Sequence, residues 1–446
     1  MQKPDNWDEL SWYEKRDKRF DYWRAAHGVN FIDKEAKAKH DRKIDRYIKA
    51  IKLEELPDRV PIDIAAGSFI AYYSGYDLKT IMFDAEKMKK ATLKYARDFD
   101  TDTMPSTGMG SGPVNELMQP RSSKWPGGGL PDDAAIIQFA EAEYMHEDDY
   151  DLYFKNPTDY ILRHFLPRNY GVFEPLAKLG PLEGFMGVGQ QLMMAAGMPE
   201  FKKMAETLLK AHEASVKWGA VMAETTQALR EIGYPAPAGG MALAPFDTVA
   251  DMLRGTHGSV MDMFRKPEAI LELADRILPN TLQTAVAMAD MSDSPIVFIP
   301  MHKGDDMFMS DKQFEKFYWP SYRKLLIGLI EEGLVPLPVI DGTYNRRLEY
   351  IKDLPKSGVI WTFEKTDMAL AKKVLGGHTC IAGNVTGAMM YTHKPDDIRK
   401  YCRWLLDTCA PGGGYILCMG SSLAGWNNPD NIHALLETGK QYGVYK

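Results

Sequence analysis

Four side chains that could act as acids, bases or hydrogen-bonding groups follow short apolar runs in the C-terminal half of the chain. They are His302, Asp341, Glu364 and Asn384, which follow the runs 295–300, 335–340, 359–363 and 380–383. A histidine or a protonated carboxyl group can donate a proton to a leaving oxygen or nitrogen. An asparagine amide can both donate and accept hydrogen bonds. Their shared position, after an apolar run, predicts one site.

The apolar runs alternate with segments long enough for helices, such as 311–332 and 395–408. A fifth run, 415–418, ends in Met419-Gly420-Ser421-Ser422. Continuous apolar strands between amphipathic helices are typical of βαβ units with a buried parallel sheet. We therefore predict an α/β fold, a (β/α)8 TIM barrel, with the polar residues and Ser421 at the carboxyl-terminal mouth, where such barrels carry out chemistry.

The N-terminal half is less regular, and three further strands are expected around 60–65, 99–104 and 237–244. Residues 1–56 are charged and helical in pattern, and we expect this N-terminal helical extension to pack on the outside of the barrel. The barrel is expected over 57–446. Residues 115–235 are expected to form a helical insertion that caps it.

Asp341 is the strongest catalytic candidate, because an acid that ends a central strand is costly to bury without a function. His302 is the second, since a histidine at a strand end of this fold is favoured for function over structure. Glu364 is a candidate too, although it could instead form an ion pair with Lys365. Two carboxylates in one cavity would raise the pKa of one of them.

The remaining candidates are assigned to substrate binding, each beside a structural alternative. Asn384 could instead cap the next helix, and the two roles are compatible. Asp63 ends the first expected strand. Asp247 could cap the helix that begins at Thr248.

Bulk composition excludes several classes of protein. The 446 residues have 45% hydrophobic and 26% charged residues, as in ordinary globular proteins. A net charge of −7 argues against a nucleic-acid-binding surface. No membrane span or signal peptide is expected. Four cysteines in this length favour a reduced, cytoplasmic setting over a disulfide framework.

Several motifs resemble the uroporphyrinogen decarboxylase superfamily over about residues 57–440. They are Pro57-Asp-Arg-Val-Pro61, Pro245-Phe-Asp-Thr248, Ser310 through Phe317-Tyr-Trp-Pro320, Ile381-Ala-Gly-Asn384 and Gly412-Gly-Gly-Tyr-Ile-Leu. The superfamily contains the decarboxylase of haem biosynthesis and corrinoid- and folate-linked methyltransferases. The resemblance implies a (β/α)8 barrel with its active site at the carboxyl ends of the strands.

Departures from the decarboxylase pattern disfavour that activity. Its Arg-Gln-Ala-Gly-Arg-Tyr motif is replaced by Ala65-Ala-Gly-Ser-Phe69, without an arginine to bind substrate carboxylates. Its Gly-His-Gly is replaced by Gly420-Ser421-Ser422. The resemblance implies that Asp100 or Asp102 occupies the place of the decarboxylase's substrate-orienting aspartate.

Departures from the zinc-dependent methyltransferases argue against bound zinc. Their His-x-Cys-Gly motif reads Val339-Ile340-Asp341-Gly342 here, and their late cysteine is replaced in Gly420-Ser421. Without thiolate ligands a zinc site would be poor for thiol alkylation. Asp353, Cys380 and Cys418 are loosely spaced like another ligand set, but Cys380 begins its strand and should lie at the wrong end of the barrel. No metal is therefore predicted.

These patterns together predict a corrinoid (cobalamin)-dependent methyltransferase that acts without a thiolate-bound zinc. The methyl group would move between a small molecule or tetrahydrofolate and the cobalt of methylcobalamin on a separate corrinoid protein, which would dock over the mouth near the insertion. The alternatives are a decarboxylase, favoured if Arg163 or Arg168 pointed into the mouth, and a non-catalytic tetrapyrrole- or corrinoid-binding protein. A homodimer is predicted only because twofold dimers are the commonest oligomers of soluble proteins.

Overall fold

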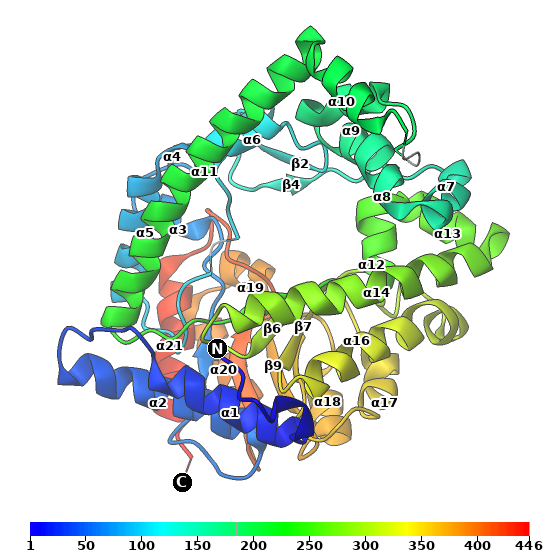
Figure 1. The fold of residues 1–446 in the computed structure, drawn as a ribbon. Coiled ribbons are helices and arrows are strands. Elements are labelled where there is room, and N and C mark those ends of the chain that lie inside the picture. The colour runs from blue at the N-terminus through cyan, green and yellow to red at the C-terminus, as the bar shows by residue number, and fades with distance from the viewer. Residues whose placement is uncertain (107, 183–185, 446) are drawn as a thin grey trace.

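A curved sheet of seven parallel strands forms the centre of the molecule (Figure 1). This computed structural model describes residues 1–106, 108–182 and 186–445. The strand order is β1-β10-β9-β8-β7-β6-β5. The strands are β1 (Ile62–Asp63), β5 (Gly240–Met241), β6 (Ile296–Met301), β7 (Val335–Ile340), β8 (Ile360–Phe363), β9 (Cys380–Val385) and β10 (Tyr415–Met419).

The five strands expected in the C-terminal half are confirmed, and their register explains why the polar residues meet. Strands β6 and β7 pair from Ile296 with Val335 to Met301 with Ile340. His302 and Asp341 therefore follow directly at neighbouring strand ends. Glu364 follows β8 in the same way, because Phe363 pairs with Ile340. The side chains of these strands are mostly buried, as expected for a parallel sheet covered on both faces.

The expected eighth strand is not formed, so a complete (β/α)8 barrel is not confirmed. Residues 99–104 occupy its place as an irregular segment: the Asp102 amide donates to the Ile62 carbonyl at 2.8 Å, and the Met104 amide to the Pro235 carbonyl at 3.0 Å. The strands expected over 60–65 and 237–244 are each only two residues long. Apolar patterning was weaker at all three places than in the C-terminal runs.

Helices cover the outer face of the sheet. They are α3 (Phe69–Tyr73), α4 (Leu78–Phe83), α5 (Ala85–Asp98), α12 (Pro245–Asp247), α13 (Gly255–Arg265), α14 (Pro267–Asp290), α15 (Asp311–Gln313), α16 (Trp319–Glu331), α17 (Leu348–Ile351), α18 (Met368–Leu375), α19 (Gly387–Thr392), α20 (Pro395–Cys409) and α21 (Pro429–Tyr442). Helix α20 buries Ile398, Cys402, Leu405 and Cys409, whose spacing places them on one face. Within the described ranges, no helix has the length and apolar character needed to cross a membrane.

The two N-terminal helices, α1 (Trp12–Ala25) and α2 (Lys34–Lys52), cover the amino-terminal ends of the strands rather than the outside of the barrel. Trp23, Ile44 and Ile48 belong to one buried cluster with residues that begin strands, among them Ile296 and Cys380. Figure 1 shows both helices below the sheet. The apolar face of α2 therefore closes the bottom of the lumen, which the helical pattern alone could not indicate.

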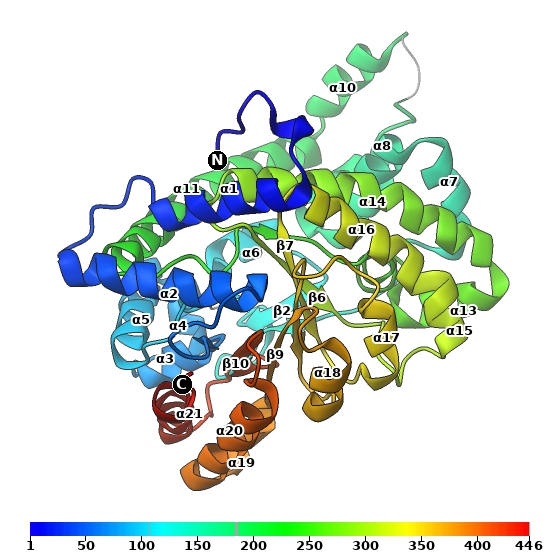
Figure 2. The same ribbon diagram turned by 90° about the horizontal axis from the view of Figure 1, so that it is seen from below.

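The segment between β1 and β5 contains more than helices. A small three-stranded sheet, β2 (Ser123–Pro126), β3 (Gly129–Leu130) and β4 (Gln138–Phe139), interrupts it. The helices are α6 (Gly112–Met118), α7 (Tyr150–Lys155), α8 (Pro157–Tyr160), α9 (Leu166–Asn169), α10 (Val188–Ala196) and the long α11 (Pro199–Glu231). Figure 1 shows β2, β4 and α7 to α10 above the sheet, at the end opposite α1 and α2, and Figure 2 shows α10 projecting from the body.

Candidate active site

An open cavity of ≈ 740 Å³ lies at the carboxyl ends of β6, β7, β8 and β10. Four predicted site residues come together in its lining: His302, Asp341, Glu364 and Ser421. The rest of the lining consists of Asp305, Met307, Phe308, Gly342, Thr343 and Lys365. The cavity therefore combines acid–base groups with an apolar wall.

His302 is oriented by Asp251, a residue of the π-helix η5 (Thr248–Leu253). The imidazole Nδ1 lies 2.6 Å from Oδ2 of Asp251, which is 6% exposed. The hydrogen bond to Asp251 raises the pKa of His302 above its ordinary value, against the effect of burial. Because Nδ1 is held by this carboxylate, Nε2 is the nitrogen left to face the cavity.

Asp247 holds the backbone on which His302 sits. Its two carboxylate oxygens accept hydrogen bonds from the amides of His302 at 3.1 Å and Lys303 at 3.0 Å. The hydroxyl of Tyr318 donates to the same carboxylate at 2.8 Å. Burial and the neighbouring Asp251 raise the pKa of Asp247 to about 6. Asp247 lies behind His302 and outside the cavity lining, where it fixes the end of β6. Its contact with substrate stays a prediction.

Asp341 lies beside His302 in the cavity lining, with its Oδ2 3.8 Å from Nε2 of the imidazole, within ion-pair distance. Desolvation and the charge of Glu364 raise the pKa of Asp341, while His302 opposes this. Glu364 accepts a long hydrogen bond from the Gly342 amide at 3.4 Å and lies 3.7 Å from Lys365. Asp341 and Glu364 thus share the cavity with a third carboxylate, Asp305, and burial raises the pKa of Asp341.

A tight loop after β7 places Gly342 and Thr343 against Asp305. Gly342 has φ +102, and a Cβ there would lie 2.1 Å from Oδ2 of Asp305. The same oxygen accepts a hydrogen bond from the Thr343 amide. Glycine is therefore required both by the backbone conformation and by the close approach of the carboxylate.

Lys303 is next to His302 but turns away from the cavity. Its ammonium donates to the Thr256 hydroxyl at 2.7 Å and lies 3.3 Å from Asp251 and 3.6 Å from Glu141. The side chain thus supports Asp251 from behind. It also joins the strand end to residue 141 of the segment between β1 and β5.

Two other predicted residues lie outside the cavity lining. The buried Asn384 amide donates to the Thr366 carbonyl at 3.0 Å and accepts from the Tyr401 hydroxyl at 2.8 Å, toward helix α20. Asp63 accepts hydrogen bonds from Tyr47 of α2 at 3.0 Å and Thr103 at 2.9 Å. Burial raises the pKa of Asp63. Both side chains are satisfied by protein partners.

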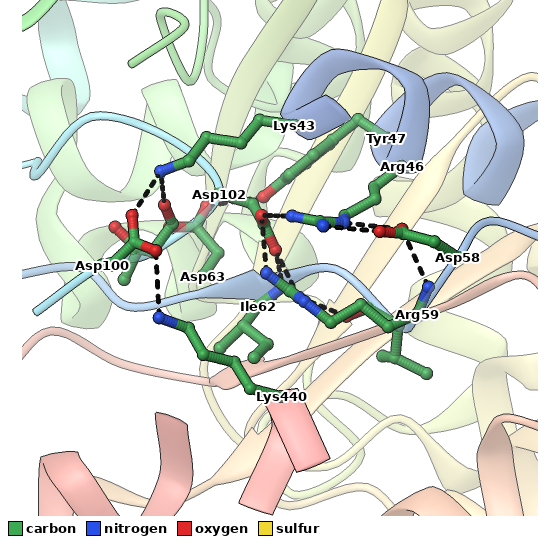
Figure 3. Close-up of polar contacts among 12 residues, drawn as sticks. Lys43, Arg46, Tyr47, Asp58, Arg59, Ile62, Asp63, Asp100, Asp102 and Lys440 are labelled. Carbon is green, nitrogen blue, oxygen red and sulfur yellow. Dashed lines mark hydrogen bonds and ion pairs between the residues drawn. The ribbon is translucent and has the colours of Figure 1, made fainter. Parts of the chain in front are cut away.

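Asp100 and Asp102 are held in ion pairs rather than directed at a substrate (Figure 3). Asp102 is fully buried and bonds to Arg46 at 2.8 Å and to Arg59 at 2.8 and 2.9 Å. Asp100 contacts the ammonium groups of Lys43, Lys39 and Lys440. These two aspartates anchor α2 through their ion pairs, and their role in substrate orientation stays a prediction.

Of the three residues considered as zinc ligands, Cys380 and Cys418 share one buried cluster, and Asp353 lies apart from them. Cys380 packs in the cluster at the amino-terminal strand ends, as predicted, whereas Asp353 pairs with Arg323 at 2.9 Å on the surface. Over the described ranges, no three His, Cys, Asp or Glu side chains are arranged to hold a metal ion.

Comparison with known proteins assigns the chain to a family. The family model for uroporphyrinogen decarboxylase (URO-D) matches residues 185–442. The chain belongs to the uroporphyrinogen decarboxylase family. A solved methyltransferase from Methanosarcina mazei has the same fold, with a TM-score of 0.58 at 15% identity over 90% of this chain and 98% of that chain. No curated protein matches in sequence.

The URO-D match covers all the residues that line the cavity, but the sequence prediction missed Asp251. A signal was present, because Asp247 and Asp251 are four residues apart after a strand end and so share one face of a helical turn. Met307 and Phe308 were missed because apolar residues in a loop give no periodic pattern. Their role as a cavity wall is visible only in three dimensions.

Proposed function

We propose that this URO-D family member is an enzyme that transfers a methyl group between a small molecule and a corrinoid carried by a partner protein. The observation that carries this proposal is the pairing of His302 with the buried Asp251, which directs Nε2 toward Asp341 within the cavity. A proton donor and a carboxylate therefore face the space where a methylated heteroatom can bind.

The electron balance explains why such a pair is useful. In the transfer to cobalt, the bond between the methyl carbon and its heteroatom breaks, and the electron pair of that bond stays on the heteroatom. The pair for the new bond comes from the reduced cobalt of the second substrate, the corrinoid. A proton from His302 to a leaving oxygen or nitrogen would contribute on the order of 10²–10⁴-fold in rate.

The cavity's position supports docking of a corrinoid protein. It is open, and Met307 in its lining is 87% exposed. The segment with β2, β4 and α7 to α10 lies at the same end of the barrel (Figure 1). A partner seated there could present cobalt to a small molecule bound in the cavity beside His302 and Asp341. Tetrahydrofolate remains a candidate methyl carrier.

The geometry gives the decarboxylase alternative no comparable support. Arg163 bonds to Asp159 at 2.8 Å, and Arg168 pairs with Asp149, both within the segment before β5. Among the described residues that line the cavity, none is an arginine. A substrate with several carboxylates would meet Asp305, Asp341 and Glu364 there, and like charges disfavour its binding.

The test is an absorbance assay with free cob(I)alamin and a panel of methylamines, methoxyaromatics, methyltetrahydrofolate and uroporphyrinogen. We expect formation of methylcobalamin that requires the protein and one methylated compound, with a slower rate in His302→Gln. Asp353→Asn, on the surface, is the matched control. Release of carbon dioxide from uroporphyrinogen without any change in cobalamin would overturn the proposal.

A further inference from the structure

The charges around the cavity restrict the substrate. Three carboxylates line it, Asp305, Asp341 and Glu364, whereas Lys365 is the one lysine in the described lining. Lys365 is 62% exposed and lies 3.7 Å from Glu364, so its charge is shared with a carboxylate at the rim. Lys303 is engaged by Thr256, Asp251 and Glu141 and does not line the cavity. His302, whose pKa is raised, is the other basic group of the lining, so carboxylates outnumber basic side chains around the free space.

The three carboxylates differ in what their oxygens contact. Asp305 accepts hydrogen bonds from the amides of Thr343 and Met307 and serves its loop. Glu364 has the Gly342 amide and Lys365. Asp341 accepts no hydrogen bond from any described residue, and its nearest basic atom is Nε2 of His302 at 3.8 Å. Asp341 is therefore the carboxylate available to a ligand.

An apolar wall lies beside this carboxylate. Met307 and Phe308 line the same cavity. Aromatic faces and methionine sulfur are favourable surroundings for the methyl groups of an organic cation.

We propose that the methyl-bearing substrate is a small organic cation, a methylated ammonium or sulfonium ion, whose charge is bound by Asp341 and whose methyl groups pack on Met307 and Phe308. This inference rests on the proposed function and specifies its substrate class. A positively charged nitrogen or sulfur leaves as a neutral group when its methyl carbon is attacked, so its departure creates no anion, and His302 can protonate a departing amine only once the bond has broken. Asp341 holds the cation, and for a protonated amine it accepts an N–H hydrogen bond.

The test is a binding measurement that needs no corrinoid. Titration calorimetry with choline, and with the uncharged analogue in which carbon replaces the quaternary nitrogen, isolates the charge of the ligand. Tetramethylammonium and pivalate extend the comparison to a smaller cation and an anion. The proteins are the full chain, Asp341→Asn and the surface control Asp353→Asn.

We expect the cations to bind on the order of tenfold tighter than the uncharged analogue. Asp341→Asn should remove most of this preference, and Asp353→Asn should keep it. Equal or tighter binding of the uncharged analogue or of pivalate, or no binding by either cation, would overturn the cation proposal. A preference that Asp341→Asn leaves unchanged would overturn the assignment to Asp341.

The cobalamin assay separates this proposal from the proposed function. Methylation of cobalamin by a methoxyaromatic but by no ammonium or sulfonium ion would overturn the cation proposal and retain methyl transfer. Charge-dependent binding without methylation of cobalamin by any compound would retain the cation site and contradict methyl transfer.

Discussion

Two aspartates, Asp102 and Asp341, lie at opposite ends of the sheet and differ in how many partners they have. At the amino-terminal end, Asp102 is fully buried and its oxygens are bonded to Arg46, Arg59 and the Ile62 amide. At the carboxyl-terminal end, Asp341 is 60% exposed, and its one ion-pair contact within the described chain is with His302 at 3.8 Å. Both residues are aspartates. The number of partners distinguishes an acid that stabilises the fold from one that is available for chemistry.

The largest effect is expected from Asp102→Asn. The substitution leaves Arg46 and Arg59 without their shared carboxylate, and breaking a buried ion pair costs about 3–5 kcal/mol. Urea unfolding measures the change in the free energy of unfolding. Asp353→Asn removes a surface pair with Arg323 and should change stability by about 0–1 kcal/mol. Equal effects of the two substitutions would contradict the anchoring role of Asp102.

The next effect is on catalysis, in Asp251→Asn. The amide cannot hold His302 Nδ1 as the carboxylate does, and a misplaced catalytic group can cost on the order of 10²-fold in rate. The kcat of cobalamin methylation should fall much more than KM rises, and the pH profile should shift toward lower pH. An unchanged pH profile would show that Asp251 does not set the protonation of His302.

Gly342→Ala should disturb the cavity loop by an intermediate amount. A positive φ costs an L-residue about 1–2 kcal/mol, and here the Cβ would also approach Asp305 to 2.1 Å. Gly412→Ala is the matched control, because Gly412 has φ +79 with open space around its Cβ position. Unfolding of both variants separates the conformational cost from the clash. Equal destabilisation would show that the Asp305 contact has no consequence.

The smallest effect is the pH dependence of stability from His302. Its pKa is raised in the folded state, so the His302–Asp251 pair contributes fully below the unfolded value of about 6.5 and loses its contribution as pH rises through the folded value. The stability difference between the wild type and His302→Gln should therefore be larger at acidic than at alkaline pH. A difference that grows with rising pH would contradict the assignment.

The two regions also differ in how well the sequence predicts them. Regular apolar runs located β6 to β10 and therefore His302, Asp341, Glu364 and Ser421, because the end of a buried strand is a local feature. The ion pairs of Asp100 and Asp102 could not be predicted, because their partners Lys43, Arg46 and Lys440 are brought to them by packing of α2 and α21. Ion pairing across such sequence distances leaves no local pattern.

A long-range contact also explains why the fold departs from the prediction at residues 99–104. The irregular segment 99–104 stands where a strand was expected, and the Asp102 carboxylate accepts the Ile62 amide that begins β1. A side chain thus replaces part of a backbone ladder, which apolar patterning cannot predict. The two-residue strands β1 and β5 lie on either side of this segment.

The most direct test of the contrast between Asp102 and Asp341 measures unfolding and methyl transfer on one variant, Asp341→Asn. We expect its urea midpoint to match that of the wild type, because Asp341 accepts no hydrogen bond from the described chain, while its rate of cobalamin methylation falls on the order of 10²-fold. A wild-type rate, or a loss of stability as large as that of Asp102→Asn, would contradict the assignment of Asp341 to chemistry.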